Sequence, residues 1–194
     1  MKPLTPLTPH IIMMVGIPGA GKTTFAERFA KTFSAPYLNP RSLSHQTGIA
    51  VNEAEAVTQL FLDELLKTNR TLLYEGPVET KAERAEVLKQ AKQAGYQTLL
   101  VWVQTEPLEA RRRAMRRQQD GTPLSSEEFD NAVAYFESPL PNEKPVVISG
   151  RHTYATQLKV VLKNVAQNRP DIYTPPPASP KNPTAPSGRN IVVR

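Results

Sequence analysis

The sequence predicts an α/β protein with a three-layer α/β/α architecture, in which helices cover both faces of a parallel sheet. Five short apolar runs have the length of β-strands, and segments with a helical pattern lie between them. Alternating strands and helices are typical of parallel sheets, because helices form the connections that cross each face. A glycine-rich segment also joins the first apolar run directly to the first helical segment.

Each predicted element rests on a local pattern. The first strand, 11–15, is apolar throughout, and a helical stretch over 22–33 follows the glycine-rich segment. Gly95 stands where a glycine is expected to end a helix, and Ser125 with Glu128 is typical of a capped helix start. In chain order, the predicted strands are 11–15, 35–38, 71–74, 97–103 and 145–148. The predicted helices are 22–33, 52–67, 80–94, 107–118, 126–137 and 153–166.

The 194 residues are enough for one compact domain, and their composition divides the chain into three parts. Residues 1–10 are expected to form an N-terminal extension, which carries three prolines and lacks the apolar core of a secretory signal. Residues 11–168 hold the α/β domain. Residues 169–194 are rich in proline, serine and asparagine, so we expect a disordered tail. The alternative is that this tail binds a protein with an aromatic groove.

Composition excludes several kinds of site. The chain has no cysteine, hence no disulfide and no thiol nucleophile, and its three histidines lack the spacing of a zinc site. No segment has the length and apolarity of a membrane span, so we expect a cytoplasmic protein. The tail holds four basic residues and one acidic residue, which is half of the net charge of +6. The rest of the chain is mildly basic, which permits contact with nucleic acid without arguing for it.

The glycine-rich segment has the spelling of a phosphate-binding loop. Residues 16–23 fit the pattern G-x-x-x-x-G-K-[ST] between a strand and a helix, as the motif requires. Glycines let backbone N–H groups point at phosphate oxygens, and the following helix adds its positive end. We expect Lys22 to bridge the β- and γ-phosphates of ATP and Thr23 to offer its hydroxyl to Mg²⁺. An incidental turn would not explain why lysine and threonine follow Gly21. The predicted nucleotide-binding residues are Gly16, Ile17, Pro18, Gly19, Ala20, Gly21, Lys22, Thr23 and Thr24.

An arginine-rich segment follows the fourth predicted strand. Residues 111–117 contain five arginines, and Pro107 suits the first turn of the helix that carries them. Arg113 and Arg117 are four residues apart and share a helix face, where two guanidinium groups can hold phosphate oxygens during transfer. One alternative is a solvated basic face paired with nearby carboxylates, and another is contact with a nucleic-acid backbone.

Glu75 is the best candidate for a carboxylate that holds Mg²⁺. It ends the strand at 71–74, and parallel sheets bind ligands at the carboxyl ends of their strands. An acidic residue at this place is also compatible with a simple surface boundary.

The sequence gives weaker signals for a site that binds the phosphate acceptor. Arg41 can bind an anionic acceptor and Asn39, Ser42 or His45 can orient one, but an irregular surface loop explains these residues equally well.

Taken together, residues 16–24, the acidic end of the third strand, Ala94-Gly95-Tyr96 and the two arginines resemble the polynucleotide-kinase-like P-loop kinases, often described as AAA-type ATP-binding domains. Tyr74-Glu75-Gly76 and Ala94-Gly95-Tyr96 are also similar to the zeta-toxin kinases, which phosphorylate a nucleotide sugar. The resemblance covers about residues 11–165. It implies a P-loop NTPase fold with a five-stranded parallel sheet and an arginine-bearing lid helix over ATP.

The sequence departs from this family at one place. Related kinases commonly carry an aspartate after the second strand as the base, and this chain reads Asn39-Pro40-Arg41-Ser42. The resemblance implies a Mg²⁺-dependent phosphotransferase that moves the γ-phosphate of ATP to a hydroxyl of a nucleic acid, nucleoside or other small metabolite. Its expected catalytic residues are Lys22, Glu75, Arg113 and Arg117, with Thr23 and Glu75 at the metal. The alternatives are an ATP-binding or ATPase regulatory module without kinase activity, and a zeta-toxin-like nucleotide-sugar kinase.

Overall fold

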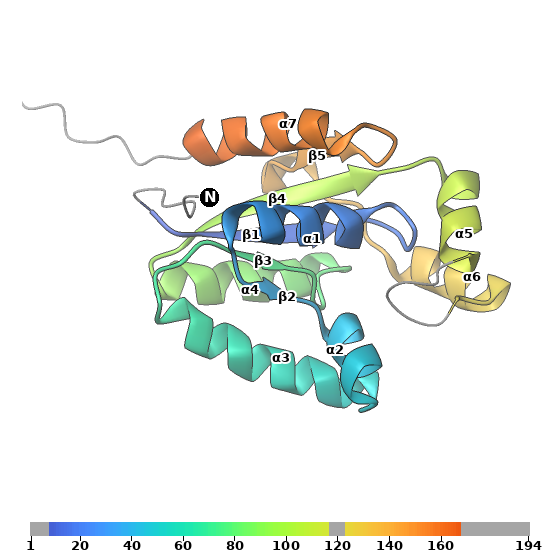
Figure 1. Ribbon diagram of the computed structural model, residues 1–194, viewed down its shortest axis with the longest axis horizontal. Helices are drawn as coiled ribbons and strands as arrows, with labels where there is room; N and C mark the ends of the chain where they lie inside the picture. Colours follow the sequence, from blue (N-terminus) through green and yellow to red (C-terminus); the bar gives the residue numbers. More distant parts are fainter. Residues whose placement is uncertain (1–7, 117–122, 168–194) are drawn as a thin grey trace, which may run out of the picture.

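The computed structural model describes residues 8–116 and 123–167, which form three layers around one parallel sheet (Figure 1). The strands are β1 (His10–Val15), β2 (Tyr37–Leu38), β3 (Leu72–Tyr74), β4 (Gln97–Gln104) and β5 (Val146–Ser149). They follow the order β2-β3-β1-β4-β5, and every neighbouring pair is parallel. The helices are α1 (Lys22–Phe33), α2 (Pro40–Thr47), α3 (Val51–Leu66), α4 (Lys81–Gln93), α5 (Pro107–Met115), α6 (Ser126–Tyr135) and α7 (Tyr154–Gln167), with a 3₁₀ turn at Pro141–Glu143. The predicted five-stranded α/β/α fold is confirmed.

Side chains of β1 point alternately into two hydrophobic cores, one on each face of the sheet. Ile12 and Met14 belong to the core that includes residues of α1 and α7. Ile11, Met13 and Val15 belong to the core that includes residues of α3 and α4. Because both faces are covered, every residue of β1 is buried, which explains the almost uninterrupted apolar run in the sequence.

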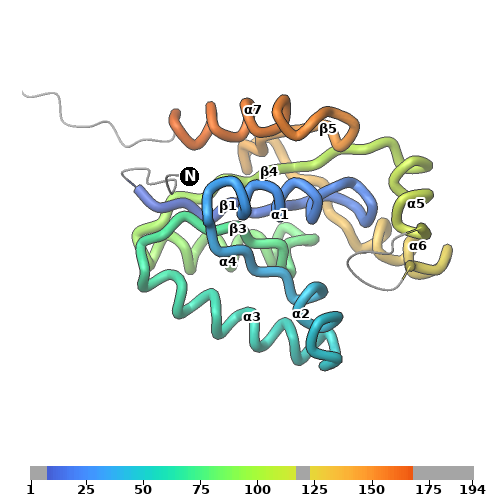
Figure 2. The backbone as a smooth tube through the Cα atoms, in the orientation of Figure 1, coloured from blue at the N-terminus to red at the C-terminus, as the bar shows by residue number. Residues whose placement is uncertain are grey.

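The carboxyl ends of the strands define the functional end of the molecule. The turn after β1, helix α2, helix α5 and helix α6 all lie at this end in the tube view (Figure 2). A parallel sheet brings the ends of all its strands to one edge, so residues far apart in the sequence meet there.

Helix α2 corrects the expectation of an irregular loop after β2. The side chain of Asn39 accepts hydrogen bonds from the backbone N–H groups of Arg41 (3.0 Å) and Ser42 (3.1 Å) and so caps the helix. Pro40 occupies the first turn, and Gly48 ends the helix in the left-handed conformation. The local signals for this short helix in the sequence are Asn39 before Pro40 at its start and Gly48, eight residues after Pro40, at its end.

Strand β1 begins at His10, one residue before the predicted start at residue 11, so the last residue of the predicted N-terminal extension belongs to the strand. The backbone N–H of His10 donates to Thr71 Oγ1 (3.1 Å), and its side chain is buried with Nδ1 2.9 Å from the Thr8 carbonyl oxygen. Burial lowers the pKa of this imidazole, and the hydrogen bond to Thr8 opposes that shift. The apolar pattern alone did not mark a histidine as part of the strand.

The two helix-end signals named in the sequence are confirmed, although α6 ends at Tyr135, two residues before its predicted end, and α5 ends at Met115. Gly95 follows α4 with φ of 78°, and Ser125 and Glu128 form the expected reciprocal cap of α6. The predicted tail at 169–194 and the last residues of the helix expected at 107–118 lie outside the described residues. Among the helices that the structure describes, none is long and apolar enough to cross a bilayer.

A buried arginine ties together the two connections that flank the functional end. Arg84, in α4, donates from Nε and Nη2 to the carboxylate of Glu143 at 2.7 and 3.1 Å. Its Nη1 donates to the carbonyl oxygens of Glu79 (3.0 Å) and Glu137 (2.9 Å). The guanidinium thus fixes the segment after β3 and the segment after α6 relative to each other, at a residue that is 3% exposed.

We expect Arg84→Met to lower the free energy of unfolding by about 3 kcal/mol, because the substitution leaves a carboxylate and several carbonyl oxygens without a buried donor. Urea denaturation measures the change. Lys67→Met is the matched control, since Lys67 forms an exposed pair with Glu64 and its loss should change stability by less than about 1 kcal/mol. Equal effects of the two substitutions would contradict this account.

Stability should also depend on pH through Glu143. The hydrogen bond from Arg84 is the main cause that lowers the pKa of this carboxyl. A carboxyl with a lowered folded-state pKa stabilises the fold above its unfolded pKa of about 4.3, and this contribution is lost as the pH falls through the folded pKa. We therefore expect Glu143→Gln to be less stable than the natural protein at pH 7, with a difference that shrinks below about pH 4. Denaturation curves of both proteins between about pH 3 and pH 7 measure this difference in stability. A difference that stays constant with pH would show that the Arg84–Glu143 pair is not its source.

Candidate active site

The phosphate loop lies between the end of β1 and the start of α1 and is packed closely against neighbouring backbone. Gly19 has φ of +74°, and a Cβ there would stand 2.0 Å from the carbonyl oxygen of Ala110 in α5. Gly150, after β5, approaches the loop from another side, since its Cβ would meet the Ala20 carbonyl oxygen at 2.0 Å. Both positions therefore require glycine, and the loop is held by α5 and by the segment after β5.

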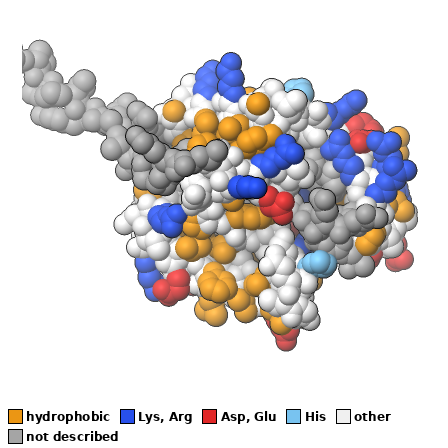
Figure 3. All heavy atoms as spheres, in the orientation of Figure 1, with side chains coloured by type: hydrophobic (Ala, Val, Ile, Leu, Met, Phe, Trp, Pro, Cys, Tyr) orange, Lys and Arg blue, Asp and Glu red, His pale blue; other side chains and the backbone are white. Residues whose placement is uncertain are grey.

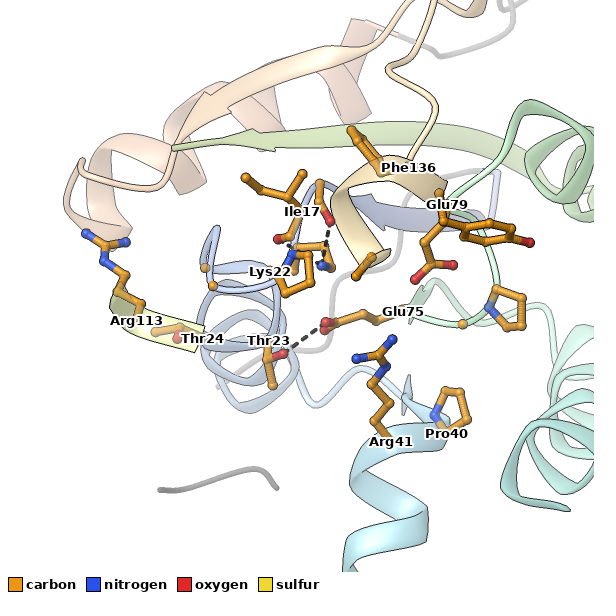
Figure 4. Close-up of a pocket in the computed structure, with 18 of the residues that line it drawn as sticks. Ile17, Lys22, Thr23, Thr24, Pro40, Arg41, Glu75, Glu79, Arg113 and Phe136 are labelled. Atoms are coloured by element: carbon orange, nitrogen blue, oxygen red, sulfur yellow. Dashed lines mark hydrogen bonds between the residues drawn. The ribbon is translucent and has the colours of Figure 1, made fainter. Parts of the chain in front are cut away.

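Lys22 is the first residue of α1, and its side chain turns back over the loop. Its Nζ donates to the carbonyl oxygen of Gly16 at 2.7 Å and to that of Ile17 at 3.4 Å (Figure 4). The ammonium thus lies at the mouth of the loop, beside the N-terminal end of α1. A positive side chain and the positive end of a helix meet at this point, which is the arrangement that binds phosphate.

The structure brings Thr23 and Glu75 together across the sheet edge. Thr23 Oγ1 donates to Glu75 Oε1 at 2.9 Å, and the hydroxyl of Tyr37 donates to the other carboxylate oxygen, Oε2, at 2.6 Å. Asn39 Nδ2 in turn donates to the Tyr37 oxygen at 2.8 Å. Burial, followed by the charge of Glu75, raises the pKa of the Tyr37 hydroxyl. Patterns in the sequence indicated Thr23 and Glu75 as residues of the site, but no pattern indicated Tyr37.

Thr23 and Glu75 have the chemistry of a magnesium site that is completed by phosphate. Magnesium usually takes one or two protein oxygens and completes its shell with phosphate and water. The Thr23 hydroxyl donates a hydrogen bond to Glu75, and a hydroxyl oxygen beside a carboxylate is the kind of oxygen pair that Mg²⁺ binds. Among the described residues, no three histidine, aspartate or glutamate side chains form a cage for a metal. The residues present therefore fit a cation bound together with a nucleotide.

The arginines of α5 divide into two roles. Figure 3 shows basic side chains gathered over this end of the molecule. Arg113 Nε donates to Glu109 (2.9 Å) and its Nη1 to the Gly150 carbonyl oxygen (3.0 Å), which ties α5 to the segment after β5. Arg113 also lines the cavity described next, as does Arg116. Arg117, the predicted partner of Arg113, lies outside the described residues.

Ion pairs account for other arginines of this segment. Arg111 pairs with Asp130 of α6 at 2.8 Å, and Arg112 pairs with Glu109 at 2.5 Å. Hydrogen bonds from Arg112 and then Arg113 lower the pKa of Glu109. A basic face paired with carboxylates thus describes Arg111, Arg112 and Arg113, and Arg113 also lines the cavity, as does Arg116.

A cavity of about 770 Å³ extends from the phosphate loop to α2 and α6 (Figure 4). The loop and the first turn of α1 form one end of it. Its other walls come from α2, α3, the segment after β3, α4, α5 and α6. The lining residues beyond the loop are Pro40, Arg41, Glu55, Glu75, Gly76, Pro77, Glu79, Glu83, Arg113, Arg116, Asn131, Ala132, Tyr135 and Phe136. Of the four candidates for the acceptor side, Arg41 lines the cavity and Asn39 caps α2, whereas Ser42 and His45 are not part of the lining.

Carboxylates dominate the wall opposite the phosphate loop. The pKa of Glu55 is raised, first by burial and then by the charge of Glu79, while Arg41 opposes the shift. Burial and the charges of Glu55, Glu79 and Glu83 raise the pKa of Tyr74 to about 12. No motif in the sequence marked these glutamates, because only the packing of α3, α4 and the segment after β3 collects them at one cavity.

Solved structures share this fold at low sequence identity. Chaetomium thermophilum Kti12 in complex with ADP-AlF3 is 18% identical, with a TM-score of 0.64 over 79% of this chain and 96% of that chain. A gluconokinase from Sinorhizobium meliloti is 15% identical, with a TM-score of 0.57 over 82% of this chain and 92% of that one. The Mycobacterium tuberculosis APS kinase in complex with AMPPNP and APS is 16% identical, with a TM-score of 0.57 over 82% and 98%. At these identities the likeness shows the fold.

The family comparison is more specific. No curated protein matches the sequence. A family model described as an AAA domain matches residues 11–139, which include the phosphate loop, Glu75 and α5. The predicted resemblance to small P-loop kinases is thereby confirmed at the level of the family. Because the match spans more than half of the chain and the geometry of the phosphate loop agrees with it, this protein belongs to the AAA domain family of P-loop proteins.

Proposed function

We propose that the protein is a Mg²⁺-dependent phosphotransferase that moves the γ-phosphate of ATP to a hydroxyl of a small molecule. One observation carries the proposal. The hydroxyl of Thr23 lies 2.9 Å from the Glu75 carboxylate at one end of a cavity that continues past the phosphate loop to α2 and α6. A triphosphate site and a separate space for an acceptor are the two parts that phosphoryl transfer needs.

The residues of the loop would hold the nucleotide. Lys22 and backbone N–H groups of the phosphate loop bind the β- and γ-phosphates, with the positive end of α1 behind them. Thr23 and Glu75 hold Mg²⁺, which when bound offsets the charge of the phosphates. Arg113 and Arg117 stabilise the charge that spreads over the transferring group. The position of Arg116 on the cavity wall supports a third cationic contact.

The size of the cavity favours transfer over hydrolysis alone. The cavity, of about 770 Å³, has the size of small-molecule sites and extends beyond the space that the loop encloses.

Both oxygens of Glu75 accept hydrogen bonds from side chains, which suits a carboxylate that holds a metal better than one that removes a proton. Figure 4 shows the Glu79 carboxylate directed into the cavity near Glu75, so Glu79 is our candidate for the base on the acceptor hydroxyl. The neighbours that are named as kinases of gluconate and of APS also favour transfer.

The charge of the acceptor wall narrows the choice of acceptor. Glu55, Glu79 and Glu83 face the cavity there, and Arg41 is the cation among the described residues of that wall. Carboxylates repel phosphorylated compounds and accept hydrogen bonds from hydroxyl and amine groups. We therefore propose a small hydroxyl compound without phosphate groups, in preference to a nucleic-acid end or a nucleotide sugar.

Lys22→Ala should weaken binding of Mg-ATP about 10- to 100-fold, because a charge-assisted contact to phosphate is lost. Isothermal titration calorimetry measures the affinity. Lys31→Ala is the control, since Lys31 is an exposed lysine in the last turn of the same helix and its substitution should leave the affinity unchanged. Equal ATP affinity in the natural protein and Lys22→Ala would refute the site.

Transfer and its acceptor can be tested in one experiment. The protein is incubated with γ-labelled ATP and separate pools of RNA and DNA ends, nucleosides, nucleotide sugars, neutral sugar alcohols and amine-bearing sugars. We expect label on a compound of one of the three pools without phosphate groups, which are the nucleosides, the neutral sugar alcohols and the amine-bearing sugars, and none on phosphorylated acceptors. Label on nucleic acid or a nucleotide sugar would contradict the acceptor proposal, and ATP binding without label on any pool would favour the regulatory module.

A further inference from the structure

The hydroxyl of Tyr37 contacts the carboxylate that our proposed function places at the metal. Tyr37 lies on β2, and its Oη is 2.6 Å from Glu75 Oε2. Thr23 holds the opposite oxygen, Oε1, at 2.9 Å. The carboxylate of Glu75 is therefore held from both sides, by a residue of α1 and by a residue of β2, and its plane cannot turn without breaking one of these bonds.

Asn39 fixes the direction of the hydrogen bond from Tyr37. The Oδ1 atom of Asn39 accepts the N–H groups of Arg41 and Ser42 at the start of α2, so its Nδ2 must face the Tyr37 oxygen, 2.8 Å away. An amide nitrogen only donates, which makes the Tyr37 oxygen the acceptor in that contact. The hydroxyl proton is then directed at Glu75. Asn39 is 7% exposed, which keeps water from replacing either contact.

In this arrangement the Tyr37 oxygen accepts from Asn39 and its one hydrogen is donated to Glu75, so the geometry alone makes Tyr37 a donor to the carboxylate. The segment Asn39-Pro40-Arg41-Ser42, which lacks an acidic residue, supplies the support for Glu75 through Asn39.

We propose that Tyr37 and Asn39 are positioning residues that orient Glu75 for Mg²⁺ and so set the metal affinity of the nucleotide site. The inference rests on the proposed function, because it takes Glu75 as the carboxylate that holds the metal. Groups that orient a metal-binding carboxylate commonly change metal affinity 10- to 100-fold when they are removed. Lys22 and the backbone of the phosphate loop contact phosphate without involving Tyr37, so binding of nucleotide without metal should not depend on this residue.

Tyr37→Phe removes one hydroxyl and keeps the ring. In calorimetry with ADP in EDTA, we expect the variant to match the natural protein within about twofold. In calorimetry with ADP at increasing Mg²⁺, the affinity for ADP should rise with Mg²⁺ in both proteins. The Mg²⁺ concentration that gives half of this increase should be about tenfold higher for the variant. Tyr154→Phe is the matched control, because it removes a hydroxyl that contacts Thr32 at 2.9 Å and does not line the cavity. It should leave the Mg²⁺ dependence unchanged.

Asn39→Asp is a second variant for which the fold should be retained. Aspartate is as good a helix cap as asparagine, so α2 should persist, but the donor to Tyr37 is replaced by a carboxylate oxygen. We expect the Mg²⁺ concentration that gives half of the gain in ADP affinity to rise here as well, with a thermal melt close to that of the natural protein.

The outcomes separate the inference from the function on which it rests. If the natural protein binds Mg-ADP and Tyr37→Phe shows the same Mg²⁺ dependence, the inference is overturned and the proposed function stands. If Tyr37→Phe weakens ADP binding in EDTA as much as with Mg²⁺, Tyr37 supports the fold rather than the metal, which also overturns the inference. If the natural protein binds neither ADP in EDTA nor Mg-ADP, the inference and the proposed function are both overturned.

Discussion

The pairing of β1 with β3 is the constraint on which the site depends. Met13 is in register with Tyr74, so β3 ends where β1 still continues toward its loop. Glu75 then leaves the sheet beside the first turn of α1 and reaches Thr23. Two residues separated by more than fifty positions thus share a hydrogen bond because the sheet places β3 next to β1, and any other neighbour for β1 would remove the carboxylate from the phosphate loop.

The same edge of the sheet carries two surfaces of opposite charge. Lys22, Arg113 and Arg116 line the cavity together with the phosphate loop, while Glu55, Glu79 and Glu83 line it from α3, the segment after β3 and α4. A polyanionic donor and an acceptor without phosphates would each find complementary charge. The separation of charges within one cavity supports our choice of a phosphotransferase over a protein that only binds ATP.

Much of the fold could be predicted because its signals are local. Apolar runs, the glycine after α4 and the reciprocal cap of α6 involve neighbours in the sequence, and each proved correct. Helix α2 was missed because eight residues carry too weak a periodicity to outweigh a polar composition, even though Asn39-Pro40 and Gly48 mark its ends. The first residue of β1 was missed because a buried histidine does not fit an apolar pattern, although Thr71 and the strand β4 accommodate it.

By itself, the sequence determined the phosphate loop and the class of fold. The loop depends on the conformations of consecutive residues, and the fold class depends on the order of short patterns, so both can be read along the chain. Only the tertiary structure decided that Tyr37 and Asn39 support Glu75, and that glutamates from α3, α4 and the segment after β3 meet opposite Lys22. These contacts follow from strand order and helix packing, which join residues that no spacing in the sequence relates.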